Sequence, residues 1–333
     1  MNQRDCVIKS IEHKSTNTIP YQLDLTLSVH EKLCDYYEDD EFLYTNIGNH
    51  LIREKNKNHR IIDPLSHQDI FGVIWKKEKE GGDIGIVSDY LLKEPQIEPY
   101  VFPKPDAGMI KSKCEHMIAN HPSLFKIYEI GFSLFERAWT LRGMESLLMD
   151  FIQEEEFVDE LLDAILEYNL GVIELAAQYP IDCIMFGDDW GQQKGLIMGP
   201  KLWKRFIKPR MEIMYKAVKG HGLYVAHHSC GDNYELFREL IEMGLDIYNT
   251  FQPEIYDMDA FKKEFGKQLT IYGGISTQGL LAHGTPAEVR ETTKRTMDAL
   301  SKDGGYIVAP THQCTSDIPL KNIFAFVETV QQQ

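Results

Sequence analysis

Over the last two thirds of the chain, short apolar runs alternate with longer amphipathic stretches. Apolar residues recur at helical spacing in these stretches, most clearly over residues 154–175. Six runs have the composition of buried strands, and they span residues 126–132, 182–189, 223–230, 246–254, 269–276 and 305–310. Regular alternation of this kind predicts βα units around a parallel sheet.

Two of the predicted helices also carry end signals. Asp232 precedes one of these helices as a candidate N-cap, and Gly244 is the residue expected to end it. Thr285, Pro286 and Glu288 form a capping box with proline at the first helical position of another. These signals place helices in the intervals between predicted strands.

The first 125 or so residues are irregular, with charged, Asn-rich and Pro-rich loops. They leave room for two more strands, so the chain fits an α/β fold: a (β/α)8 TIM barrel with an irregular N-terminal extension. Residues 1–333 are expected to form this barrel as a single domain. A doubly wound open sheet is the alternative, but no Gly-rich phosphate loop follows any predicted strand.

The charge balance narrows the classes of partner. The chain has 35 basic and 51 acidic residues, a formal charge of −16. This argues against a nucleic-acid or anionic-lipid surface, which would need a basic face. No apolar run is long enough to span a membrane. The start lacks the apolar stretch of a signal peptide. The six cysteines are scattered along the chain and do not form a disulfide framework. We therefore expect a cytoplasmic protein.

Polar residues cluster where the predicted strands end, in the segments GDDWGQQ, AHHSCGD, NTFQPE, YGGIS and APTHQC. In a parallel barrel these strand ends converge on one mouth. The sequence therefore predicts an active site there.

His228 and Cys230 are the most specific feature of this mouth. Residues two apart on a strand point to the same face, so the imidazole and the thiol should aim together into the barrel. Nitrogen and sulfur ligands suit zinc, and the last strand end offers His312 or Cys314 as a third ligand. The alternative is that the cysteines only pack, as small apolar side chains. His227 should face the helices.

Asp188 and Asp189 should diverge by the same alternation. A carboxylate in the mouth could act as acid or base, orient a ligand or bind substrate, whereas the alternative is a helix cap or a loop salt bridge. Further candidates at the mouth are Glu254 for catalysis and, for substrate binding, Gln193, Gln252 and Trp190.

Several blocks of the chain resemble the uroporphyrinogen decarboxylase superfamily, which includes methylcobalamin:coenzyme M methyltransferases and corrinoid-dependent demethylases. The resemblance is strongest over residues 131–150, 186–210, 227–254, 272–289 and 304–323. Uroporphyrinogen decarboxylases themselves carry an arginine-rich segment near the N-terminus that grips the substrate's carboxylates. The matching residues here, 19–32, contain no arginine and offer Asp24, which argues against heme-pathway decarboxylation.

The methyltransferase branch of that superfamily holds zinc on a His-x-Cys pair and a distant cysteine. Here the resemblance implies His228 and Cys230, with either His312, favoured by alignment on Pro319, or Cys314. It implies a zinc-dependent methyltransferase that moves a methyl group between a small methylated substrate or thiol and a corrinoid (cobalamin) carried by a partner protein. In that mechanism Asp188 or Asp189 would orient a ligand or the substrate, and Glu254 would be a proton partner.

Three other functions stay open. One is decarboxylation of a smaller acid without metal, with Asp188 handling the proton. The second is heme-pathway decarboxylation itself, for which we expect no activity. The third is a non-catalytic binding protein on a barrel scaffold, which the crowded polar mouth disfavours.

Overall fold

The parallel strands form because their residues are apolar on both faces and helices cover them. In the computed structural model, which describes residues 1–77 and 85–333, the six predicted strands are all present, and nearly all of their residues are buried. They are β6 (Phe125–Ile130), β7 (Cys183–Gly187), β8 (Tyr224–His228), β9 (Ile247–Phe251), β10 (Thr270–Ile275) and β11 (Tyr306–Pro310).

The order of the strands favours a barrel-type sheet over a doubly wound one. With β1 (Leu51–Lys55), the order is β1-β6-β7-β8-β9-β10-β11, the same as in the sequence. A doubly wound sheet would instead reverse its order at a switch point. The described residues give this sheet seven strands, so the α/β class is confirmed, and the closed eight-stranded barrel stays a prediction.

By contacts, the chain forms two compact units. The first unit comprises residues 1–52, 121–126 and 245–333, and the second comprises residues 53–120 and 127–244. Each is described by itself.

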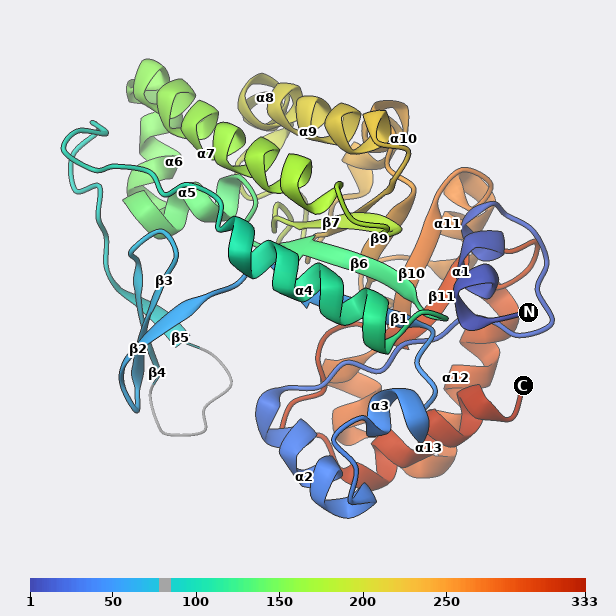
Figure 1. Ribbon diagram of the computed structural model, residues 1–333. Helices are drawn as coiled ribbons and strands as arrows, with labels where there is room; N and C mark the ends of the chain where they lie inside the picture. The colour runs from blue at the N-terminus through green and yellow to red at the C-terminus, as the bar shows by residue number, and fades with distance from the viewer. Residues whose placement is uncertain (78–84) are drawn as a thin grey trace. The chain divides into compact units, whose positions relative to one another are not determined.

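In the second unit, β6, β7 and β8 pair in parallel, with Ile127 opposite Cys183 and Cys183 opposite Tyr224. Long helices pack beside these strands, and α7 contacts both α4 and α9 (Figure 1). The helical segments are α4 (Ala107–Asn120), α5 (Phe135–Arg142), α6 (Met144–Gln153), α7 (Glu155–Ala176), α8 (Gly199–Leu202), η1 (Trp203–Ile207), α9 (Lys208–Gly220), η2 (Tyr234–Leu236) and α10 (Phe237–Met243).

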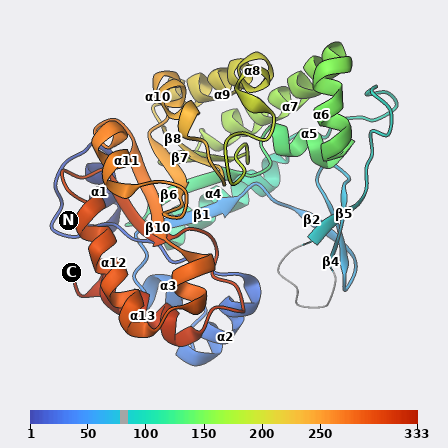
Figure 2. The same ribbon diagram turned by 180° about the vertical axis from the view of Figure 1, so that it is seen from behind.

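In the first unit, β10 lies between β9 and β11. Residues 21–25 run beside β11 and the segment that follows it, through single parallel bridges from Tyr21 to Val308 and from Leu25 to Cys314. Helices α12 and α13 pack side by side (Figure 2). The helical segments are α1 (Gln3–Ile11), α2 (Leu27–Tyr37), α3 (Phe42–Thr45), α11 (Met258–Phe265), η3 (Thr277–Leu281), α12 (Pro286–Leu300) and α13 (Leu320–Gln331).

The predicted helix ends are largely confirmed. Thr285 and Glu288 form the capping box of α12, and Gly244 ends α10 in a left-handed conformation with φ of 106°. The start after Asp232 differs slightly: Asn233 is the residue that precedes η2, and the Asp232 carboxylate accepts the N–H of Tyr234 at 3.1 Å.

The irregular N-terminal extension contains a small antiparallel sheet that the sequence analysis did not predict. Its strands follow the order β2-β3-β4-β5. They are β2 (His59–Asp63), β3 (Ser66–Asp69), β4 (Ile74–Lys77) and β5 (Gly85–Asp89). These strands are short and carry polar residues on both faces, so they lack the apolar alternation that identifies a half-buried strand.

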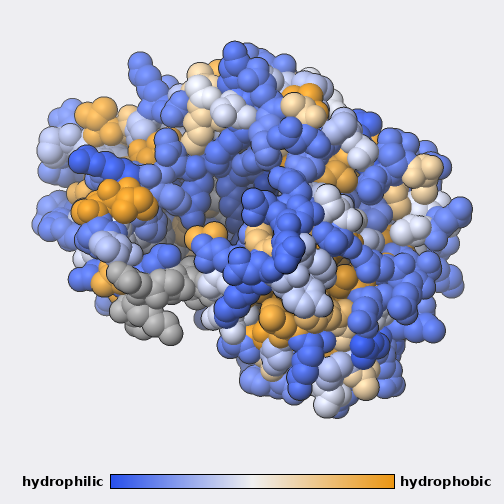
Figure 3. Space-filling model, turned by 60° about the horizontal axis from the view of Figure 1, so that its bottom comes forward, coloured by the Kyte–Doolittle hydropathy of each residue, from blue (hydrophilic) through white to orange (hydrophobic). Residues whose placement is uncertain are grey.

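The surface is mostly polar on the face that Figure 3 shows. On the face shown in Figure 3, hydrophilic side chains predominate and apolar ones are interspersed among them. Within the described residues, no helix is both long enough and apolar enough to cross a membrane.

Candidate active site

The side chains of β7 and β8 separate by alternation into two sets. His227 faces the helices, where it is fully buried, stacks on Trp190 at 4.3 Å and shares a 2.9 Å hydrogen bond with the Tyr215 hydroxyl. Burial lowers the pKa of His227 to about 3 and keeps its ring neutral. His228, one residue on, points to the opposite face of the sheet.

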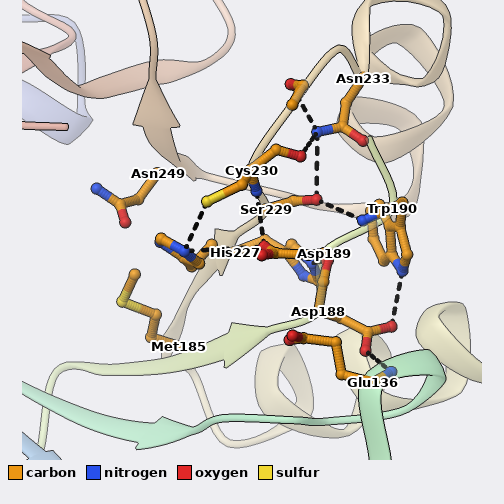
Figure 4. A network of polar contacts seen from close by, with 12 residues as sticks. Glu136, Met185, Asp188, Asp189, Trp190, His227, Ser229, Cys230, Asn233 and Asn249 are labelled. Carbon is orange, nitrogen blue, oxygen red and sulfur yellow. Dashed lines mark hydrogen bonds and ion pairs between the residues drawn. The ribbon is translucent and has the colours of Figure 1, made fainter. Parts of the chain in front are cut away.

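On that opposite face, Asp189, His228 and Cys230 come together. Figure 4 shows Asp189 and Cys230 side by side. The Cys230 Sγ lies 3.5 Å from His228 Nε2, and Asp189 Oδ1 lies 3.8 Å from the same nitrogen. The backbone N–H of Cys230 donates to Asp189 Oδ1 at 2.7 Å. One nitrogen, one sulfur and one oxygen thus lie within 4.8 Å of one another on three half-buried side chains. We call these residues the triad.

Acidic groups crowd together at the triad, and each disfavours ionisation of the others. Burial raises the pKa of the Cys230 thiol, and the carboxylates of Asp189 and Glu136 raise it further. Burial, followed by the charges of Asp189 and Asp188, also holds the pKa of Glu136 well above its ordinary value. A divalent cation would relieve this repulsion, because it stabilises thiolate and carboxylate together. Mixed nitrogen, sulfur and oxygen donors are a set that zinc accepts, so the residues present fit zinc.

Asp188 serves a different purpose from its neighbour. It is fully buried and accepts the backbone N–H groups of Leu134, Phe135 and Glu136 at 3.2, 3.0 and 2.8 Å. It also accepts the indole N–H of Trp190 at 2.7 Å. Burial outweighs these donors and raises the pKa of Asp188 to about 6. The geometry is that of a cap on the N-terminus of α5, which leaves Asp189 as the carboxylate beside His228 and Cys230.

Glu136 is a functional candidate that the sequence analysis missed. It lies in the first turn of α5, directly after the carboxyl end of β6, and its carboxylate accepts the backbone N–H of Asp189. An acidic residue in the first turn of a helix usually reflects the helix dipole alone. The signal that could have found it is its position just beyond a strand end, where barrel active sites lie.

Two glycines let the loops after β7 and β8 meet. A Cβ on Gly191 would lie 2.5 Å from the carbonyl carbon of Gly231, and Gly231 itself has a φ of 79°. Further bonds join the same loops: Trp190 N–H to Ser229 Oγ at 3.1 Å, and Asp232 N–H to the Gln192 carbonyl at 2.8 Å. This contact holds Asp189 next to Cys230.

The other candidates of the second unit lie outside the triad. Trp190 is fully buried and packs edge-on against Trp203 at 5.4 Å, so it belongs to the core. Gln193 is exposed on the loop after β7.

The remaining candidates belong to the first unit. Gln252 and Glu254 follow β9, and the Ser276 hydroxyl donates to the Glu254 carboxylate. His312 is exposed. Cys314 is fully buried, its N–H donates to the Asp24 carbonyl at 2.8 Å, and burial raises the pKa of its thiol.

Comparison with known proteins supports the resemblance seen in the sequence. The family model described as uroporphyrinogen decarboxylase (URO-D) matches residues 132–333. The chain belongs to this family. No curated protein matches it. The predicted superfamily is thereby confirmed, and the match to the URO-D family includes all three residues of the triad.

Two solved structures are similar to this URO-D family member over almost their whole lengths. A methyltransferase from Methanosarcina mazei has a TM-score of 0.76 at 13% identity, covering 100% of this chain and 99% of that chain. A B12-independent methionine synthase from Shewanella sp. W3-18-1 has a TM-score of 0.50 at 11% identity, covering 97% and 98%. At these identities the likeness shows a shared fold.

Proposed function

We propose that this URO-D family protein is a zinc-dependent methyltransferase that moves a methyl group between a small methylated substrate or thiol and a corrinoid protein. The observation that carries the proposal is the triad: Asp189, His228 and Cys230 bring three ligand atoms within 4.8 Å of one another. The likeness in fold to a methyltransferase supports it.

The triad residues would hold the metal, with His228 through Nε2, Cys230 through its sulfur and Asp189 through Oδ1. When bound, zinc acts as a Lewis acid that stabilises negative charge on the sulfur or oxygen of the group that gains or loses methyl. The prediction of a further ligand at His312 or Cys314 stays a prediction. Exposure favours His312, since the Cys314 thiol is fully buried.

The surrounding residues position the triad and hold a proton. The Asp189 carboxylate is oriented by the Cys230 N–H, and the Asp189 backbone by Glu136. Because the pKa of Glu136 is raised, its carboxyl group can hold a proton close to the reacting atoms. Asp188, buried under α5, acts on the site only through the backbone that it fixes.

Bonds, electron pairs and protons balance for methyl transfer in both directions. Toward a thiol, the S–CH3 bond forms as the Co–CH3 bond breaks, the electron pair of that bond stays on cobalt, and the thiol proton passes to solvent or a nearby base. Toward the corrinoid, the O–CH3 or S–CH3 bond breaks, cobalt supplies the electron pair for the new Co–CH3 bond, and the leaving oxygen or sulfur takes up a proton.

The family match also favours a second candidate, decarboxylation of a small acid without metal. In that case the protonated carboxyl group of Glu136 would supply the proton to the carbanion left after CO2 departs. Metal analysis separates the two proposals.

The first test is the zinc content of the purified protein and of its Cys230→Ser variant. We expect about one zinc per chain in the wild type, as in catalytic zinc sites, and loss of most of it in the variant. Cys34→Ser is the matched control, because Cys34 is half-buried on α2 and should not affect the metal. Methyl transfer from methylcobalamin to a panel of small thiols should be lost together with the zinc.

Two results would overturn the proposal. One is a wild-type protein that takes up no zinc from a zinc-containing buffer. The other is a Cys230→Ser variant that keeps both its zinc and its rate of transfer.

A further inference from the structure

Three aromatic rings lie together at the carboxyl end of β6. The centre of the Phe132 ring is 5.3 Å from that of Trp75 on β4 and 6.2 Å from that of Trp139 on α5. All three side chains are half-buried, so each ring keeps part of its surface accessible to solvent. We call Trp75, Phe132 and Trp139 the aromatic wall.

The backbone of Phe132 passes over the face of the sheet that carries the triad. Gly187 ends β7 and lies opposite His228 in the parallel register, so a side chain at Gly187 would point to the same face as His228. A Cβ added to Gly187 would lie 3.3 Å from the Gly131 Cα and 3.9 Å from the Phe132 nitrogen. The segment that follows β6 therefore lies on the triad's face of the sheet.

Phe132 also has an unusual backbone conformation. Its φ of 51° lies in the left-handed region, which bulky side chains rarely adopt. The next residue is anchored, because the N–H of Ser133 donates to the Gly187 carbonyl at 2.8 Å. Residues held in such conformations cluster at binding sites and active sites. The turn that presents the Phe132 ring is thus fixed to the end of β7.

Trp139 connects the aromatic wall to Glu136. Residues three apart on a helix are neighbours on its surface, so Trp139 and Glu136 lie on one side of α5. The Glu136 carboxylate accepts the backbone N–H of Asp189, a residue of the triad. A group bound against Trp139 would therefore lie close to the triad.

Trp75 reaches the aromatic wall from the small sheet. It lies opposite His67 in the register of β3 and β4, and Asp69 is two residues further along β3, so Trp75 and Asp69 point to the same face. The indole N–H of Trp75 donates to the Asp69 carboxylate at 3.1 Å, and Arg137 on α5 donates to the same carboxylate at 2.7 Å. These bonds hold the Trp75 ring beside α5. Trp75 precedes residue 132, where the family match begins.

The surroundings of the Phe132 ring favour an uncharged aromatic ligand over a methylated cation. The Arg137 guanidinium lies over this ring, 5.6 Å from its centre. A quaternary ammonium or sulfonium group, which also binds to aromatic faces, would compete with that guanidinium for the same ring. A flat, uncharged ring can pack edge-on or offset against indole and phenyl rings, which is more favourable than burial of the same apolar area alone.

We propose that the aromatic wall binds a flat aromatic group of the small molecule that gives or accepts the methyl group, and thereby selects aromatic over aliphatic substrates. This inference rests on the proposed function. The ring of the substrate would pack against Trp139 and Phe132, and Trp75 would close the wall from the side of the small sheet.

The experiment compares phenylmethanethiol and cyclohexylmethanethiol as acceptors of methyl from free methylcobalamin. The two thiols have the same carbon skeleton, and only the phenyl ring is flat and aromatic. For the wild type, we expect kcat/KM to be about fivefold higher for the phenyl compound, the size of one aromatic pair. In Trp75→Leu and Trp139→Leu this ratio should fall toward unity, because leucine keeps apolar area and removes the ring. Calorimetric titration with each thiol, without methylcobalamin, should show the same preference in Kd.

Two further variants keep the test decisive if a leucine variant does not fold. Phe132→Gly removes the third ring at a position whose φ suits glycine, and it should also lower the ratio. Trp75→Phe keeps a ring without the indole N–H and should retain the preference. The matched control is Tyr36→Leu, which replaces an aromatic side chain that is 64% exposed on α2, and its ratio should equal that of the wild type.

The outcomes separate the two proposals. If the rings only fasten the small sheet to α5, the leucine variants lower kcat/KM for both thiols by the same factor and leave the ratio unchanged. That result, or a wild type without preference for the phenyl compound, would overturn the aromatic wall while the transferase stands. A wild type that transfers methyl to no thiol of the panel would overturn the proposed function, and the aromatic wall with it.

Discussion

At the scale of the residue, burial decides which imidazoles can bind a metal or a proton. His50 and His227 are buried, and their pKa values fall to about 4 and about 3 because the charged ring would lose its hydration. His228 is half-buried, with Asp189 and Cys230 beside Nε2. Of these three histidines, His228 is the one suited to coordinate an ion.

His50 gives a clear dependence of stability on pH. Its ring lies 4.5 Å from that of Tyr21, and burial is the main cause of its low pKa. An imidazole with a folded pKa below the unfolded value stabilises the fold fully above pH 6.5, and this contribution is lost as pH falls toward 4. Between pH 7 and pH 5 the wild type should lose about 2 kcal/mol of unfolding free energy through this group.

Urea unfolding of His50→Gln at both pH values checks this, because glutamine fills a similar volume and does not titrate. The difference between wild type and variant should shrink at pH 5. An equal pH dependence in the two proteins would show that His50 is not held neutral by burial.

At the scale of the element, Asp188 fixes the start of α5 and thereby Glu136. Replacing Asp188 by alanine leaves three backbone N–H groups and the Trp190 indole without their acceptor. We expect the unfolding free energy to fall by about 4 kcal/mol or more, since each of the four buried donors left unpaired costs about 1 kcal/mol or more. Denaturant unfolding at neutral pH measures it.

Asp189→Ala is the contrasting variant. Asp189 is half-buried and its side chain accepts one backbone N–H, so its loss should cost about 1 kcal/mol while removing a zinc ligand. If both variants lost the same unfolding free energy and the same amount of zinc, the assignment of Asp188 as helix cap and Asp189 as zinc ligand would be wrong.

The elements that could be predicted from the sequence are those that depend on a pattern of neighbouring residues. The six parallel strands and the capping box at Thr285 depend on neighbouring residues, and both are present. The strands β2–β5 could not be predicted, because polar residues on both faces carry no alternation. The contact of Glu136 with Asp189 joins two consecutive βα units, so the residue pattern within either unit does not predict it.

The triad was anticipated only in part, for the same reason. The two-residue spacing of His228 and Cys230 predicts that their side chains share a face, and they do. Alternation also predicts that Asp188 and Asp189 diverge, but not which one lies beside the thiol. That choice depends on the turn from β6 into α5, whose N–H groups capture Asp188.

At the scale of the whole molecule, the chain is a URO-D family member with a charge of −16. The family match begins at residue 132, and the unpredicted small sheet lies before it. In the region that resembles the carboxylate-gripping segment, Asp24 lies beside Cys314 through a backbone hydrogen bond. The molecule thus presents an acid there in place of arginines.

We therefore expect no formation of coproporphyrinogen from uroporphyrinogen, because a polyanionic substrate would be repelled by the acidic molecule. Chromatography of the oxidised porphyrins after incubation with the enzyme measures it, with an authentic uroporphyrinogen decarboxylase as the positive control. Steady turnover to coproporphyrinogen would replace the transferase proposal with the heme-pathway activity.

The close approach of Gly191 and Gly231 has a consequence for engineering this scaffold. Since a side chain on Gly191 would collide with the neighbouring backbone, the two loops form one unit, and neither can be lengthened before that point without displacing the thiol. Residues 193–195 lie beyond it, two of them exposed. Libraries aimed at new methyl acceptors should diversify that short stretch and leave both glycines untouched.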